Sequence, residues 1–149
     1  MTTMATHIAA RLQQDATVTS LCASRVYDHD VRKAGPEAQV VEGPFGFTTP
    51  YIVVDDSGGL RAPFGPTSAY QDRIRVWIFA ENSTTGRSAI EQLTARVLAR
   101  LHRWQEANTK ALVSFADRTG FVADPPPHTG AMDVLTFAVA GVYVGLTTS

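Results

Sequence analysis

Residues 72–101 read DRIRVWIFAENSTTGRSAIEQLTARVLARL, a strand pattern that passes through a short polar turn directly into a helix pattern. Alternation predicts a strand over 70–80, because successive side chains of a strand point to opposite faces. Its second half is apolar on both faces, which indicates a strand covered on two sides or pressed against another subunit. One face carries Ile74, Val76 and Ile78, and the other carries Arg73, Arg75, Trp77 and Phe79.

A helix is predicted over 86–103, with Thr84 or Thr85 as its N-cap. At 1.5 Å per residue it would be roughly 27 Å long, enough to cover one face of a sheet. Its residues form two stripes at helical spacing. The apolar stripe consists of Ile90, Leu93, Val97, Leu98, Leu101 and Trp104, and the basic stripe of Arg96, Arg100 and Arg103.

The remaining elements are shorter and separated by long loops. The patterns predict a short N-terminal helix over 5–14, a brief helical turn beginning at Asp15, and four further strands. This order favours an α+β fold: a mixed, largely antiparallel sheet with one major helix packed on a face. We expect a single domain over 1–149, strands at 25–28, 51–56, 111–117 and 132–144, and long loops at 31–49, 57–69 and 118–130.

The composition of the chain excludes several classes of function. The 149 residues have a net charge of −1, which calls for neither nucleic acid nor acidic lipid. The single Cys22 cannot form an internal disulfide and fits assembly in a reducing compartment. No segment approaches the roughly 18 apolar residues of a membrane span, and the N-terminal stretch MTTMATHIAARLQQ has no apolar run long enough for a signal peptide. We therefore expect a soluble domain made in the cytoplasm.

Residues suited to catalysis are scattered. The four histidines, His7, His29, His102 and His128, show no metal-ligand spacing. Asp28 and Asp30 would share one face of a strand and could hold a cation, although a solvated turn explains such a pair more simply. Phosphate-loop, dinucleotide and nucleophile-elbow motifs are all missing. The sequence predicts no enzyme, no metal and no cofactor.

The basic stripe has two interpretations. Its spacing of i, i+4 and i+7 places three guanidinium groups on one side of the helix. A solvated face is the commoner outcome for such a stripe. The alternative is an ionic contact with a neighbouring subunit or with nucleic acid passing nearby.

The order of the elements resembles the tail terminator (tail completion) proteins of long-tailed bacteriophages and gene transfer agents. The resemblance extends over nearly the whole chain, and the segments that carry it are LQQDATVTSLCASRVYD, PYIVVDD, YQDRIRVWIFAENSTTGRSAIEQLTARVLARL and VLTFAVAGVYV. The third segment contributes most, because family members commonly show an alternating strand, a small polar turn and a helix there. The segment between Tyr27 and Tyr51, which contains 31–49, is longer than is usual in the family.

The resemblance implies a structural protein of the virion tail or neck, assembled in the bacterial cytoplasm. Such a protein forms a homo-oligomeric ring, a hexamer, that caps the tail tube and stops its growth. Its partners are the major tail tube protein and the head-tail connector or head-closure protein, and DNA passes through the lumen without sequence-specific binding. The expected subunit or tube contacts are Phe45, Phe47, Leu60, Arg61, Phe64, Arg96, Arg100 and Arg103.

Three alternatives stay open. The first is a head-closure or connector component of the neck, which differs in the partner that the ring binds. The second is a small metal-dependent hydrolase that uses Asp28, Asp30 and Asp55, for which titration with magnesium or manganese is the test. The third, a generic ligand-binding α+β domain, has no distinctive residue in its favour.

Overall fold

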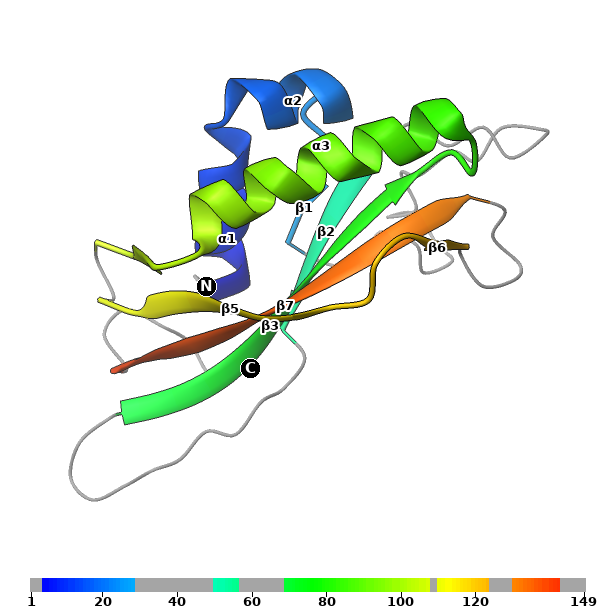
Figure 1. Cartoon of the computed structure of the whole chain (residues 1–149). Coiled ribbons are helices and arrows are strands. Elements are labelled where there is room, and N and C mark those ends of the chain that lie inside the picture. Colours follow the sequence, from blue (N-terminus) through cyan, green and yellow to red (C-terminus); the bar gives the residue numbers. More distant parts are fainter. Residues whose placement is uncertain (1–3, 29–49, 57–68, 108–109, 124–129, 143–149) are drawn as a thin grey trace, which may run out of the picture.

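The computed structural model describes residues 4–28, 50–56, 69–107, 110–123 and 130–142. Three helices and seven strands lie in these ranges (Figure 1). The helices are α1 (Met4–Gln13), α2 (Ala16–Cys22) and α3 (Thr84–Leu101). The strands are β1 (Val26–Tyr27), β2 (Tyr51–Asp56), β3 (Ala69–Ala80), β4 (Trp104–Gln105), β5 (Leu112–Arg118), β6 (Val122–Ala123) and β7 (Ala131–Val142).

All seven strands belong to one sheet, in the order β1-β2-β3-β7-β5-β4, and β6 pairs with β7 beside this path. The pairing of β1 with β2 is parallel, and every other pairing is antiparallel. The predicted fold class, α+β with a mixed and largely antiparallel sheet, is therefore confirmed.

The centre of the sheet is the pair β3 and β7, which are in register over twelve residues each. The predicted alternation in β3 is confirmed: Ile74, Val76 and Ile78 are buried, whereas Arg73 and Arg75 are exposed on the other face. On β7 the same buried face is continued by Leu135, Phe137 and Val139. Because a one-residue slip would expose every buried residue of a strand, this pattern fixes the register.

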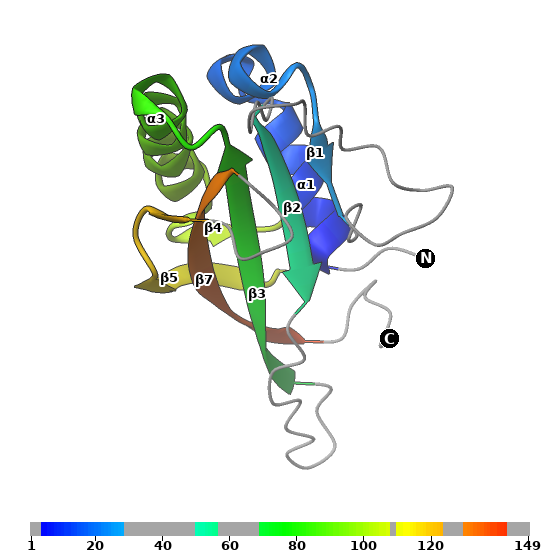
Figure 2. The ribbon, with the colours of Figure 1, turned by 90° about the vertical axis from the view of Figure 1, so that its right-hand side faces the viewer.

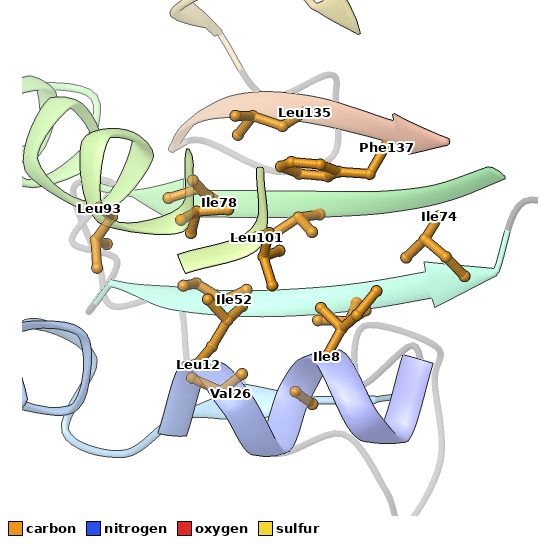
Figure 3. Close-up of a cluster of buried hydrophobic side chains, with 14 of the residues drawn as sticks. Ile8, Leu12, Val26, Ile52, Ile74, Ile78, Leu93, Leu101, Leu135 and Phe137 are labelled. Carbon is orange, nitrogen blue, oxygen red and sulfur yellow. The ribbon is translucent and has the colours of Figure 1, made fainter. Parts of the chain in front are cut away.

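Helices α1 and α3 cover one face of the sheet (Figures 1 and 2). In Figure 3, Ile8 and Leu12 of α1 point toward β2, and Leu93 and Leu101 of α3 lie against the same layer. All four side chains are fully buried in the main hydrophobic core, together with Ile52 and Ile78 of the sheet and Phe137 of β7. The major helix thus packs on a face, as predicted.

The N-terminus of α3 differs from the prediction by two residues. The helix begins at Thr84, and its N-cap is Ser83 rather than Thr84 or Thr85. The Ser83 hydroxyl accepts a hydrogen bond from the amide of Gly86 at 3.1 Å. A Cβ atom at Gly86 would lie 1.7 Å from the carbonyl oxygen of Glu81, so only glycine fits this tight turn.

The C-terminus of α3 also differs. The helix ends at Leu101, and Arg103 then has a positive φ of 61° that turns the chain into β4. Trp104 therefore belongs to β4 and not to the apolar stripe of the helix, and Arg103 is not part of the basic stripe. The guanidinium of Arg11 lies over the Trp104 ring, 4.8 Å from its centroid, which ties α1 to this turn.

The predicted loop 118–130 contains regular structure. Arg118 still belongs to β5, and β6 pairs with β7 through Val122 and Met132. A two-residue strand is too short to produce a period that a sequence pattern reveals. The predicted loop 31–49 lies outside the described residues, as does 57–69 except for Ala69, which begins β3. The last predicted strand, 132–144, corresponds to β7 up to the end of the described range at residue 142.

Candidate assembly surface

Asp15 connects α2 to α3. It is the N-cap of α2, where its Oδ1 accepts hydrogen bonds from the amides of Thr17 and Val18 at 2.9 and 3.1 Å. Its Oδ2 accepts from Arg96 of α3 through Nε at 3.0 Å and Nη2 at 2.5 Å, and from Arg100 Nε at 2.8 Å. The carboxylate is 1% exposed, so these bonds compensate the desolvation of its charge.

The electrostatics of this group follow from the contacts. The hydrogen bonds from Arg96, above all, hold the pKa of Asp15 well below its usual range, although burial opposes the shift. Asp15 in turn raises the pKa of Arg96. Arg11 donates from Nε to the carbonyl oxygen of Arg100 at 2.7 Å, and burial together with the charge of Arg100 lowers the Arg11 pKa.

The basic stripe is thus only partly a surface feature. Arg96 and Arg100 bind Asp15, yet their side chains remain 40% and 35% exposed. Arg103 lies beyond the helix and is exposed. The predicted basic stripe is therefore not fully solvated, because two of its arginines bind Asp15. It is also not a row of three arginines on one helix, because the helix ends before Arg103. Whether these arginines contact another subunit stays a proposal.

A second buried carboxylate, Asp133 of β7, holds α3 from the sheet side. Its Oδ2 accepts from the hydroxyl of Thr94 at 3.2 Å and from Arg118 Nε at 2.7 Å, and its Oδ1 accepts from the amide of Gly120 at 3.1 Å. The side chain is fully buried. Asp133 and Asp15 together fix the position of α3 relative to the sheet and to α1 and α2.

The opposite face of the sheet carries a second, smaller apolar cluster, formed by Tyr51, Val53 and Phe79. Tyr51 stacks on Phe79 with ring centroids 4.7 Å apart, and Trp77 lies 6.2 Å from Phe79 in a nearly parallel orientation. Half-buried Tyr27 and Met132 pack against this cluster, as does Trp77. This arrangement confirms that the second half of β3 is apolar on both faces.

One margin of the sheet exposes apolar side chains. Among the described residues the exposed large hydrophobics are Leu112, Phe115 and Val122, all on β5 and β6. The backbone N–H of Phe115 donates to Nδ1 of His102 at 3.1 Å. The His102 side chain therefore provides the acceptor for one backbone donor of β5. Sequence reasoning did not select these residues, because single apolar residues in a strand usually face the core.

Several predicted site residues cannot be located in the fold. Phe45, Phe47, Leu60, Arg61 and Phe64 all lie outside the described residues. Their assignment as contacts therefore stays a prediction.

The carboxylates of the hydrolase alternative are only partly described. Asp28 accepts a hydrogen bond from the Thr6 hydroxyl at 3.0 Å, and Asp55 is paired in register with Arg75, while Asp30 lies outside the described residues. Within the described ranges, no group of three or more His, Cys, Asp or Glu side chains is placed to hold a metal ion. The helices of the same ranges include none long and apolar enough to cross a membrane.

Local sequence patterns do not reveal that the two buried aspartates fix the position of α3. They predict Asp15 only as the start of a helical turn and Asp133 only as part of a strand. A single charged residue inside an otherwise apolar strand, as at Asp133, is the signal that a buried polar contact leaves in a sequence.

Comparison with known proteins reveals similarity in structure alone. No protein-family model matches the chain, and no curated protein sequence matches it. Among solved structures, a chain described as "Virion of native gene transfer agent (GTA) particle" superposes with a TM-score of 0.65 at 12% sequence identity. The match covers 93% of this chain and 95% of the other. At this identity the likeness establishes a shared fold.

Proposed function

We propose that the protein is a structural component of a phage-like virion. The observation that carries this proposal is the fold likeness to a chain of a gene transfer agent virion, which extends over nearly the full length of both chains. A likeness that covers both chains from end to end compares whole domains rather than one common motif. Fold alone does not determine function, so the proposal needs its own test.

Within the virion we assign the chain the role of tail terminator. In this role copies of the chain form a hexameric ring that caps the tail tube, stops its growth and joins the tail to the head connector. Support comes from the order of elements over the whole chain and from the unit β3, turn and α3, which two buried aspartates hold rigid. A ring requires each copy to present the same geometry at one repeated heterologous contact.

The proposed contacts are those that the sequence indicates. Apolar and aromatic loop residues act as anchors, because a few buried aromatic side chains contribute most of the energy of an interface. The partners are further copies of the chain, the tail tube protein and the connector, and DNA passes through the lumen without sequence-specific contacts. The proposed contact residues are Phe45, Phe47, Leu60, Arg61, Phe64, Arg96, Arg100 and Arg103.

A tube-growth experiment tests the role. The tail tube protein of the same genome is allowed to polymerise with and without this protein, and tube lengths are measured by sedimentation. The terminator role predicts short, length-limited tubes, and Phe64→Ala should weaken this limit while the fold stays intact. Ser88→Ala, at an exposed position of α3 outside the proposed contacts, is the control.

The head-closure alternative makes a different prediction. A neck component would bind the connector and leave tube growth unchanged. Unlimited growth together with connector binding therefore contradicts the terminator role and favours the neck role.

A further inference from the structure

Three arginines lie close together where α1 meets α3, and two of them bind a single carboxylate. We call Arg11 of α1 with Arg96 and Arg100 of α3 the basic cluster. Arg96 and Arg100 both donate to Asp15 Oδ2, and Arg11 is joined to Arg100 through its 2.7 Å bond to the carbonyl oxygen of that residue. Two chain segments that are far apart in sequence, 11–15 and 96–100, thus bring their charges together.

The cluster has an excess of two positive charges. Asp15 is its only acidic hydrogen-bond partner among the described residues. Two other carboxylates of the described ranges have different partners: Glu106 lies 3.6 Å from His7, and Glu91 lies 3.4 Å from Arg87. The charge of Arg100 contributes to lowering the pKa of Arg11, which is the behaviour of cations that repel one another.

The cluster also has unused hydrogen-bond donors. A guanidinium carries five N–H donors in a fixed fork. Toward the described residues, Arg100 donates from Nε alone, and so does Arg11, which leaves the terminal nitrogens of both available. Arg100 is 35% exposed and Arg96 is 40% exposed, so a ligand can reach the group from solvent.

We propose that the basic cluster binds the carboxylates of an acidic segment of a partner protein. The cluster already binds one carboxylate through Nε and Nη2 donors, and its excess charge is complementary to further carboxylates. The forked donors of arginine suit such groups better than the single ammonium of lysine.

Nucleic acid fits the cluster less well. Binding to a duplex depends on neutralising several successive phosphates, whereas the three arginines form one compact group. The ring of Trp104, the aromatic side chain beside the cluster, is covered by Arg11 and is not presented to a base.

A binding experiment on the isolated protein tests the proposal. The probe is a fluorescein-labelled peptide of alternating Glu and Gly, titrated at low salt and followed by anisotropy, with a labelled DNA duplex of equal charge as the comparison. We expect saturable peptide binding that Arg11→Gln weakens at least threefold. Arg11→Gln is the sharpest variant, because Arg11 makes no bond to Asp15 and glutamine can still donate to the Arg100 carbonyl oxygen.

Two further variants complete the test. Arg87→Gln removes a positive charge from α3, the helix of Arg96 and Arg100. Because Arg87 is already paired with Glu91, this variant should leave peptide affinity unchanged. Asp15→Asn should tighten peptide binding in protein that circular dichroism shows to be folded, because it removes the competing carboxylate. Absence of saturable peptide binding, an Arg11→Gln affinity equal to that of the natural chain, or tighter binding of the duplex would each overturn the proposal. None of these readouts depends on ring formation, so this inference and the terminator role fail separately.

Discussion

Asp15 Oδ2 lies 2.8 Å from Arg100 Nε, although 85 positions separate the two residues in the chain. The same carboxylate caps α2 through its other oxygen. One side chain therefore links the start of a short helix to the last turn of the major helix. A seven-residue helix is too short to be stable in water by itself, so α2 depends on such contacts.

Replacement of Asp15 should separate its two roles. Asp15→Ala removes both the cap and the partner of the arginines, and we expect a loss of about 2–3 kcal/mol in the free energy of unfolding. The loss stays below that of a fully buried ion pair because both arginines reach solvent. Asp15→Asn keeps an oxygen for the cap and should lose about half as much. Urea denaturation measures both, and equal losses would contradict a separate role for the cap.

The pH dependence of stability follows from the lowered pKa of Asp15. A carboxyl group whose pKa is lower in the folded state stabilises the protein above its unfolded pKa of about 3.9, and this contribution disappears as pH falls through the folded value. The difference in stability between the natural chain and Asp15→Asn should therefore be constant from pH 7 to about 5 and shrink below pH 4. Urea midpoints at several pH values test this. A difference that stays the same at pH 3 would contradict it.

Gly86→Ala should destabilise the protein by at least about 2 kcal/mol. The added Cβ would lie 1.7 Å from the backbone carbonyl oxygen of Glu81, and backbone cannot rotate away as a flexible side chain can. Ser88→Ala, at an exposed position two residues further along α3, is the control and should change stability by no more than about 0.5 kcal/mol. Thermal unfolding of both variants decides the matter. Similar melting temperatures for the two would show that the turn can relax.

Asp133 and Thr94 should be coupled energetically. Asp133→Ala leaves Arg118 and the Gly120 amide without their acceptor, and we expect a loss of about 3 kcal/mol or more. Thr94→Val removes one hydroxyl bond and should lose about 1 kcal/mol. A double-mutant cycle should give a coupling of at least about 0.5 kcal/mol. Thr85→Val, at an exposed position of α3, should show none when it is combined with Asp133→Ala.

Cys22 should be chemically inert in the folded protein. Its side chain is fully buried, and burial raises the pKa of the thiol to about 12. Because the thiolate is the reactive form, an aromatic disulfide reagent at pH 8 should react within seconds in urea but only slowly under native conditions. Absorbance of the released thiolate measures both rates. Fast native labelling would show that α2 opens readily.

The elements that the sequence predicts well are those with a local period. The alternation of Ile74, Val76 and Ile78 and the stripe through Leu93 and Val97 depend on neighbouring residues alone, so strand and helix both follow from them. The ends of α3 do not, because Ser83 and Arg103 are selected by turns that join the helix to β3 and β4. Helix boundaries are generally the less reliable part of such a prediction.

The arrangement around α3 could not be predicted from local patterns. The contacts of Arg96 with Asp15 and of Thr94 with Asp133 join residues 81 and 39 positions apart. Nothing in a strand pattern states that β7 lies between β3 and β5. The spacing of Arg96 and Arg100 was read correctly as one side of a helix, but the partner of that side became visible only in the folded chain.

The central claim is that this chain ends a tail tube, and electron microscopy of tube ends tests it most directly. The purified protein is mixed with growing tubes of the tail tube protein from the same genome, and the ends are imaged and averaged. The account predicts an extra layer of density with six-fold symmetry on capped tubes that no longer grow. Tubes with bare ends that continue to lengthen in the presence of folded protein would contradict it.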